Sequence, residues 1–433
     1  MKKIALITIL LGVSAGVLLG GILREARPSG AIAADASTSA LEARQRARDT
    51  VGLIRGLQST LSATPDDPRT LTLLGLAYHQ RYRESADPTY LGRAAGLFRR
   101  TLELSPGDPE ATSGLAGLAL SQHRFRTALS LAREAQRLAP DSVRPYGALG
   151  DALIELGRYD EAFSTFDRMS ELRPNLASYA RVAYARELLG RPRTAIEAMS
   201  LALEVSAGRP EPAAWAFVEL GKLHFGLGET AKARGYFRSA LGALPGYVYA
   251  LDWLARSEAA AGRFDRARSL SRRAVDAVPL PQFVATLADI ERARGNLVGA
   301  REQYALMATI QELLRANGVN SDLELALFRV DHGIRLPEAL ALARTARAGR
   351  PSIYGDDVLA WALARNGRCG EALAYSKRSL RLGTKDASLY FHRGMIERCL
   401  GRDAVAREWF ARALETNPDF SLIWAETARR YAS

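Results

Sequence analysis

The first pattern along the chain is a long apolar run near the N-terminus. Residues 1–3 give a short basic start, and residues 4–23 then carry no Asp, Glu, Lys or Arg. A run of about twenty uncharged residues is long enough to cross a bilayer as a helix, and it exceeds the apolar part of most secretory signals. We therefore expect a transmembrane anchor or uncleaved signal over residues 4–23, and we favour the anchor over a cleaved signal.

The segment that follows predicts a tether between the membrane and the folded part. Residues 24–40 are rich in Ala and Ser beyond their first charged positions. Lys2 and Lys3 precede the apolar run while Arg24 and Arg27 follow it, so the distribution of positive charge barely distinguishes the two orientations. Because the start resembles an export signal, we expect a single-pass protein of the bacterial cytoplasmic membrane with its folded part outside the cytoplasm, in the periplasm or at the cell surface. A cytoplasmic folded part is the alternative.

Beyond the tether, small, large apolar and polar positions recur with a fixed period. Pro106, Pro140 and Pro174 are spaced by 34 residues. Periods of this length indicate stacked units, each made of a few secondary-structure elements. The chain is therefore organised by a repeat.

The third unit shows what the period encodes. Gly150 and Ala162 are small enough for two helices to approach closely, and Phe166 fills the space between them. Gly157 marks the end of the first helix, since glycine tolerates the left-handed conformation of a C-terminal cap. Pro174 cannot continue the second helix. Each unit therefore predicts a pair of helices.

The same register extends over residues 68–418 and gives about ten units. The exposed apolar ends of such a stack need covering, and the helical patterns over residues 41–67 and 419–433 predict capping helices there. The small position of the second helix is alanine in every unit: Ala94, Ala128, Ala162, Ala195, Ala233, Ala267, Ala300, Ala339, Ala372 and Ala406.

With these motifs the chain resembles the tetratricopeptide-repeat (TPR) superfamily along nearly all of residues 50–433. More narrowly, it is similar to bacterial exported or membrane-anchored TPR proteins in two stretches, residues 77–90 and residues 359–420. The resemblance implies an all-α solenoid, a right-handed superhelix of helix-turn-helix units, here with an N-terminal transmembrane helix. It also implies a role in binding and assembly rather than a reaction.

The resemblance further implies which side chains line the concave face, because the first helix of each unit faces inward there. Aromatic, Arg and Lys side chains are favoured at interface hot spots, so these positions predict a groove for an extended or helical segment of a partner protein. The alternative is that the aromatics pack between helices and the charges are merely solvated. The predicted partner-binding residues are Tyr184, Glu187, Trp215, Lys222, Phe225, Tyr249, Arg256 and Arg292.

The two cysteines of the chain are Cys369 and Cys399. In register, adjacent hairpins bring both to the same edge of the solenoid, which permits a disulfide in an oxidising compartment; two free thiols are the alternative. Two cysteines alone do not make a structural zinc site, and the five histidines lie in separate units without metal-ligand spacing. We therefore expect neither a metal nor a cofactor.

Composition, charge and motifs argue against two further classes of function, nucleic-acid binding and catalysis. The net charge is +12, but the arginines are spread singly along the chain, which argues against a nucleic-acid surface and leaves acidic partners or anionic lipids open. No nucleophile elbow, phosphate-binding loop or paired carboxylates rise above chance, and the repeats leave no room for a catalytic domain. We expect neither an enzyme nor a small-molecule substrate.

Together these patterns predict a membrane-anchored TPR scaffold or adaptor that binds a protein segment in its concave groove, for assembly of an envelope complex. One alternative is an accessory component of polysaccharide export, in which Trp215, Tyr249 and Trp361 stack on sugar rings. The other is a cytoplasm-facing TPR regulator that recruits enzymes or nucleic acid to the membrane.

Overall fold

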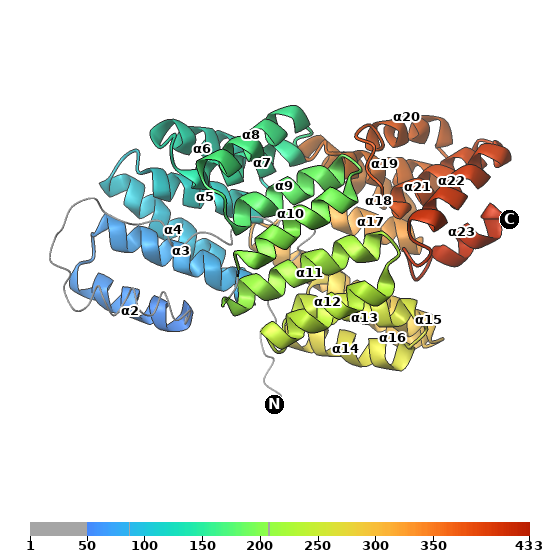
Figure 1. Ribbon diagram of the computed structural model, residues 1–433, viewed down its shortest axis with the longest axis horizontal. Helices are drawn as coiled ribbons and strands as arrows, with labels where there is room; N and C mark the ends of the chain where they lie inside the picture. Colours follow the sequence, from blue (N-terminus) through green and yellow to red (C-terminus); the bar gives the residue numbers. More distant parts are fainter. Residues whose placement is uncertain (1–49, 86, 207) are drawn as a thin grey trace.

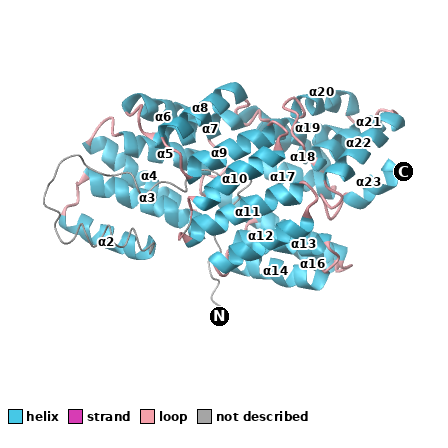
Figure 2. Ribbon diagram, in the orientation of Figure 1, coloured by secondary structure: helices cyan, strands magenta, loops and turns pink. Residues whose placement is uncertain are grey.

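The computed structural model describes residues 50–85, 87–206 and 208–433, and this part of the chain is folded into α-helices and their connections (Figures 1 and 2). The predicted anchor, the predicted tether and the start of the predicted N-terminal cap, residues 1–49 in all, lie outside the described residues. Within those that are described, no helix is long and apolar enough to cross a membrane.

Twenty helices of the described chain form ten successive hairpins, each a first helix joined by a short turn to a second. The hairpins are α3 (Pro68–Ser85) with α4 (Thr89–Leu104), α5 (Pro109–Ser121) with α6 (Phe125–Leu138), α7 (Val143–Glu155) with α8 (Tyr159–Leu172), α9 (Leu176–Leu188) with α10 (Pro192–Glu204), α11 (Pro210–Gly226) with α12 (Thr230–Ala243), α13 (Val248–Ala260) with α14 (Phe264–Ala277), α15 (Pro281–Ala293) with α16 (Leu297–Ala316), α17 (Asp322–His332) with α18 (Leu336–Gly349), α19 (Ile353–Arg365) with α20 (Cys369–Ser379), and α21 (Ala387–Cys399) with α22 (Asp403–Thr416).

Each hairpin is held by the small and large residues that the repeat predicts. A Cβ atom added at Gly150 would lie 2.2 Å from a ring carbon of Phe166, so only glycine leaves room for this phenylalanine. Phe166 is 1% exposed, and Ala162 beside it is fully buried. Gly157 has a φ of +69°, in the left-handed region that favours glycine at the end of a helix.

Two further helices cover the ends of the stack. At the N-terminal end, α2 (Thr50–Ala63) buries Leu53 and Leu57 against α3. At the C-terminal end, α23 (Ala425–Ala432) is shorter than the predicted cap. Residues 419–424 form turns instead, where the Ser421 hydroxyl accepts the backbone N–H groups of the residues two and three positions further on.

The stack of hairpins coils so tightly that its second turn rests on its first. Hydrogen bonds join residues that are 192 to 197 positions apart, which is between five and six repeats of 34 residues. In Figure 1 the orange and red hairpins accordingly lie against the teal and green ones. The bonded pairs are His123 with Asn320, Tyr159 with Ile353, Leu188 with Thr384, and Phe225 with Asn417.

The contacts between the two turns follow one rule. The short loop between the two helices of an early hairpin, or the helix end beside that loop, contacts the connection that follows a later hairpin. A Cβ atom at Gly190 would lie only 2.1 Å from the carbonyl oxygen of Gly383, and one at Gly157 would lie 2.5 Å from that of Pro351. These glycines therefore serve both the helix end and the contact between turns.

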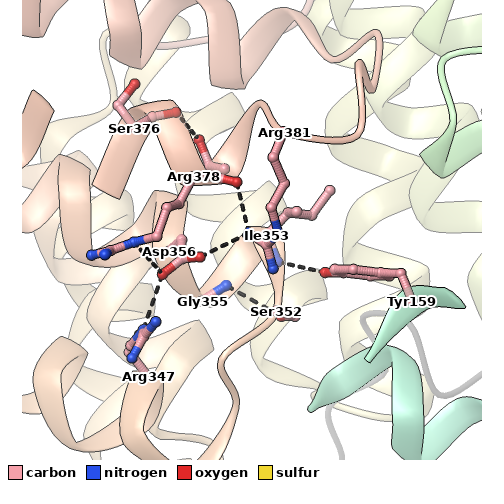
Figure 3. Close-up of polar contacts among 10 residues, drawn as sticks. Tyr159, Arg347, Ser352, Ile353, Gly355, Asp356, Ser376, Arg378 and Arg381 are labelled. Carbon is pink, nitrogen blue, oxygen red and sulfur yellow. Dashed lines mark hydrogen bonds and ion pairs between the residues drawn. The ribbon is translucent and has the colours of Figure 1, made fainter. Parts of the chain in front are cut away.

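Figure 3 shows one of these contacts in detail. The Tyr159 hydroxyl, from the early hairpin, accepts the backbone N–H of Ile353 at 2.7 Å. Asp356 is 1% exposed and accepts from Arg347 at 3.0 Å and from Arg381 at 2.9 Å. The Arg381 guanidinium also lies 5.1 Å from the ring centroid of Tyr159. Polar and aromatic contacts thus hold the two turns together.

Candidate functional site

The first helices line a partly open cavity of about 550 Å³, here called the axial cavity. Its wall is formed almost wholly by first helices, those of seven successive hairpins from α9 to α21, with α16 and residues 419–424 completing it. Pockets of roughly 300–1,000 Å³ hold most ligands of small-molecule size. The cavity therefore has room for a short stretch of a partner rather than a whole domain.

The C-terminal segment closes part of this wall through Trp424. The indole N–H of Trp424 donates to Asp331 Oδ1 at 3.1 Å, and the indole N–H of Trp361 donates to the same oxygen at 2.9 Å. The two indole rings meet edge to face with centroids 5.7 Å apart. Burial raises the pKa of Asp331, although His392 and the indole donors oppose the rise.

Aromatic rings make up much of the lining. Trp253 already carries two cations near its ring, since Lys222 Nζ lies 5.9 Å and the Arg256 guanidinium 5.2 Å from its centroid. Such cation–π pairs are attractive because the ring face is electron-rich. The aromatic lining residues are Tyr184, Phe225, Trp253, Phe328, Tyr354, Phe420 and Trp424.

The cavity wall carries more acidic than basic side chains, although the chain as a whole has a net charge of +12. Its basic residues are Lys222, Arg256 and Arg350, and two histidines, His332 and His392, also face it. The acidic lining residues are Glu187, Glu219, Asp289, Glu324, Asp331, Asp357, Asp386 and Asp419.

This crowding of carboxylates shifts several pKa values. Burial raises the pKa of Glu187 to about 7; Lys222 lowers it while other nearby carboxylates raise it further. Burial alone lowers the pKa of His392, but the Asp357 carboxylate 2.9 Å from its Nδ1 reverses the effect and leaves that pKa raised. The raised pKa of His392 shows that the carboxylates beside it favour the charged imidazole.

Several polar atoms of the wall have no hydrogen-bond partner in the described structure. They are Asp357 Oδ1, Glu324 Oε2 and both polar atoms of the Gln282 side chain. Asp357 is only 5% exposed, so its free oxygen is cut off from bulk solvent. Buried polar groups are ordinarily hydrogen-bonded, so these atoms are available to hydrogen-bond to a ligand in the cavity.

Five of the eight predicted groove residues lie on the cavity wall. All five come from α9, α11 and α13, the first helices of the fourth to sixth hairpins. They are Tyr184, Glu187, Lys222, Phe225 and Arg256.

The other three predicted residues lie elsewhere. Trp215 is 8% exposed and belongs to a core cluster that contains Leu176 of the preceding hairpin. Tyr249 packs edge to face on Phe283 with ring centroids 5.7 Å apart. Arg292 lies exposed near the end of α15. Trp215 and Tyr249 thus face neighbouring hairpins, and Arg292 faces solvent.

Sequence reasoning did not assign the half of the wall contributed by the later hairpins to the partner-binding groove. Two of its histidines pair with an aspartate about one repeat earlier: His332 with Asp289 at 2.7 Å, and His392 with Asp357. An aspartate followed one repeat later by a histidine at a neighbouring inward position is a signal that would have linked them. Each histidine taken alone carries no such information.

Trp361, the third aromatic residue expected to stack on sugars, is 1% exposed and packs inside the C-terminal core.

Cys369 and Cys399 are joined by a disulfide, with Cα atoms 6.1 Å apart. The bond ties the start of α20 to the end of α21, at the edge of the solenoid. It therefore links the ninth and tenth hairpins, which both contribute to the cavity.

Paired helices, inward-facing first helices and a concave binding surface define the class of TPR solenoids. A family model described as tetratricopeptide repeat matches residues 91–143, 182–248, 254–318 and 358–419, which is more than half of the chain. A second model of the same description matches residues 119–189. The chain belongs to the tetratricopeptide-repeat family.

The structural comparison finds solved structures of low sequence identity. The human IFIT1 dimer with m7Gppp-AAAA is 14% identical, with a TM-score of 0.49, and the match covers 89% of this chain and 90% of that one. The APC/C hetero-tetramer Cut9–Hcn1 is 13% identical, with a TM-score of 0.38 and coverage of 93% and 97%. PilF of Pseudomonas aeruginosa is 19% identical, with a TM-score of 0.37 and coverage of 55% and 96%. Comparison with curated proteins gives no match.

Proposed function

We propose that this protein is a binding scaffold, not an enzyme, that holds a short segment of a partner protein in the axial cavity. The observation that carries the proposal is the cavity wall itself. Seven consecutive first helices converge on one space and leave buried polar atoms there without partners. Concave surfaces of stacked repeats are the surfaces that such proteins use for binding.

The size of the cavity limits what is held. About 550 Å³ accommodates a short anchoring stretch, while the rest of the partner would lie outside the superhelix. The seven aromatic side chains of the wall supply the apolar area that a bound segment needs. A short, deeply held anchor is the arrangement in which a few residues contribute most of the binding energy.

The proposal includes a place in the cell. The uncharged run over residues 4–23 would anchor the chain in the bacterial cytoplasmic membrane, and residues 24–40 would tether the superhelix outside the cytoplasm, where it would help to assemble an envelope complex. The Cys369–Cys399 bond supports an oxidising compartment, because disulfides are rare in the cytosol.

A substitution that fills the axial cavity tests the proposed function. Ala285 lines the cavity, so Ala285→Trp should block it. Ala231→Trp adds the same bulk at an exposed position of α12 and is the matched control. After chemical crosslinking in the native host, we expect the same partner protein with the wild type and A231W and its loss with A285W, given equal melting temperatures. Undiminished recovery by A285W would refute the role of the cavity.

Orientation is tested separately with reporters fused to the C-terminus, one active only outside the cytoplasm and one only inside. We expect activity of the external reporter. Activity of the internal reporter alone would place the superhelix in the cytoplasm and favour the cytoplasm-facing regulator instead.

A further inference from the structure

We infer that the segment held in the axial cavity is positively charged and presents a Lys or Arg side chain to its wall. This inference rests on the proposed function and adds the chemistry of the partner. It is carried by the charge, the unpartnered atoms and the aromatic faces of the cavity.

The negative charge of the wall is only partly offset by its own bases, because eight carboxylates face three Lys and Arg side chains and two histidines. Lys222 pairs with Glu219 at 2.8 Å, whereas Arg256 pairs at 2.9 Å with Asp252, a carboxylate that is not part of the lining. Arg350 likewise divides its charge between Glu324 of the wall and Glu155 of the other turn of the superhelix. Asp419 pairs at 3.3 Å with Arg429, which is not part of the lining. Among the described residues, the other carboxylates of the wall have hydrogen bonds to neutral groups or to histidines, or have no ion-pair partner.

Three of those carboxylates show this directly. Among the described residues, the donors to Asp331 are two indole N–H groups, and Asp386 accepts from the backbone N–H groups at the start of α21. Glu187 has Lys222 as its main opposing charge, and burial outweighs this attraction and raises the pKa of Glu187 to about 7. An added cation would relieve the cost of holding these groups ionised.

The unpartnered atoms require donors. Asp357 Oδ1 and Glu324 Oε2 are carboxylate oxygens, which only accept hydrogen bonds when ionised. Ammonium and guanidinium groups have N–H donors and no acceptor. A Lys or Arg side chain therefore complements these oxygens in both charge and hydrogen bonding.

The aromatic wall is suited to the same groups. Trp253 already attracts Lys222 and Arg256 over its ring, which shows that cations are accommodated on these faces. The wall continues with Tyr354, Phe420 and Trp424 on the opposite run of hairpins. An acidic segment would instead be repelled by the carboxylates of this wall.

Calorimetric titration of the full chain in detergent with three pentapeptides tests the inference. The peptides consist of alanine with two arginines, two glutamates or no charged residue. We expect the arginine peptide to bind at least tenfold more tightly than the neutral one, with affinity falling as salt is raised, and no binding of the glutamate peptide. Equal affinities for the three peptides would overturn the inference.

Neutralising variants locate the binding. Asp357→Asn should weaken binding of the arginine peptide about tenfold or more, because it removes a buried charged acceptor. Asp276→Asn, at an exposed position of α14, should leave binding unchanged. Glu187→Gln is a second cavity variant, should D357N fail to fold. Unchanged binding in every folded cavity variant would contradict the inference.

Two further outcomes are decisive. If spermidine binds as tightly as the arginine peptide, the cavity takes a small amine and the assignment to a protein segment falls. If A285W loses a partner in the host but no basic peptide binds, the scaffold function stands and the inferred charge of the segment is wrong. The two proposals therefore fail separately.

Discussion

Arg350 holds both turns of the superhelix with one guanidinium. It is 5% exposed, donates from Nη2 to Glu155 at 2.8 Å and from Nη1 to Glu324 at 2.8 Å, and lies 5.4 Å from the centroid of the Phe125 ring. Burial lowers its pKa, but the two carboxylates outweigh this and hold the pKa above its usual range. Such a residue matters for stability because its loss leaves buried carboxylates without a counter-charge.

Arg350→Ala should therefore lower the free energy of unfolding by about 3–5 kcal/mol, measured by urea denaturation at pH 7. Arg126→Ala is the matched control. Arg126 also bridges the two turns, donating to the Ala348 carbonyl oxygen at 3.0 Å, but it is exposed, so its loss should cost less than about 1 kcal/mol. Similar losses in the two variants would show that the Arg350 pair is not buried in solution.

Glu187 makes stability depend on pH. Burial raises its pKa from 4.5 to about 7, so between these values the folded chain binds more protons than the unfolded one. The contribution of Glu187 to the free energy of unfolding should thus fall as the pH rises from about 4.5 to 7. We expect Glu187→Gln to show a shallower decline than the wild type in urea denaturation at pH 5, 6, 7 and 8. Parallel curves would contradict the shifted pKa.

At the scale of the helices, the connections inside the hairpins divide into those that touch another turn of the superhelix and those that do not. Gly190 and Gly262 occupy equivalent connections and have φ values of +68° and +73°. A Cβ atom at Gly190 would lie 2.1 Å from the Gly383 carbonyl oxygen, whereas one at Gly262 would meet nothing within 4 Å. Substitutions at these two positions therefore separate the cost of backbone strain from the cost of losing contact between superhelical turns.

Gly262→Ala should cost about 1–2 kcal/mol, the cost of a left-handed residue with a side chain. Gly190→Ala should cost the same amount and, in addition, the free energy lost when the second superhelical turn is displaced. Its melting temperature should therefore be clearly lower than that of Gly262→Ala. Thermal unfolding followed by circular dichroism measures both. Equal melting temperatures would mean that the turns do not touch at this point.

Contacts within one hairpin are predictable from the sequence, whereas contacts between turns of the superhelix are not. Gly150 and Phe166 meet within one repeat, so their spacing predicts the hairpin. Gly190 and Gly383 meet only because small rotations between successive hairpins add up over more than five repeats, and no local motif specifies that sum. The contact between turns was therefore not predictable from the repeat.

The candidate site follows the same division. Tyr184, Lys222 and Arg256 were predicted because they occupy inward positions of successive first helices. Asp331 and Trp424 were not, since they face those helices only after the chain has completed a superhelical turn. The sequence thus indicated one wall of the cavity and not the closure that makes it a cavity.

At the scale of the whole molecule, the disulfide provides a test of the proposed extracytoplasmic compartment. The bridged residues are 30 positions apart, and closing a loop of that length stabilises a protein by about 3–4 kcal/mol. In protein isolated from the native host under alkylating conditions, we expect mass spectrometry to find Cys369 linked to Cys399. A reductant should lower the melting temperature of the wild type and leave that of the double variant C369S/C399S unchanged. Two alkylated thiols in freshly isolated protein would contradict the proposed compartment.

The central claim is that the two turns of the superhelix touch and so deepen an open concave surface into a partly enclosed cavity. Small-angle X-ray scattering from residues 50–433 in solution measures this most directly. We predict a scattering curve that agrees with the one calculated from the closed superhelix, at low and high salt alike. A larger radius of gyration and maximum dimension, as expected of a superhelix without contact between its turns, would contradict it.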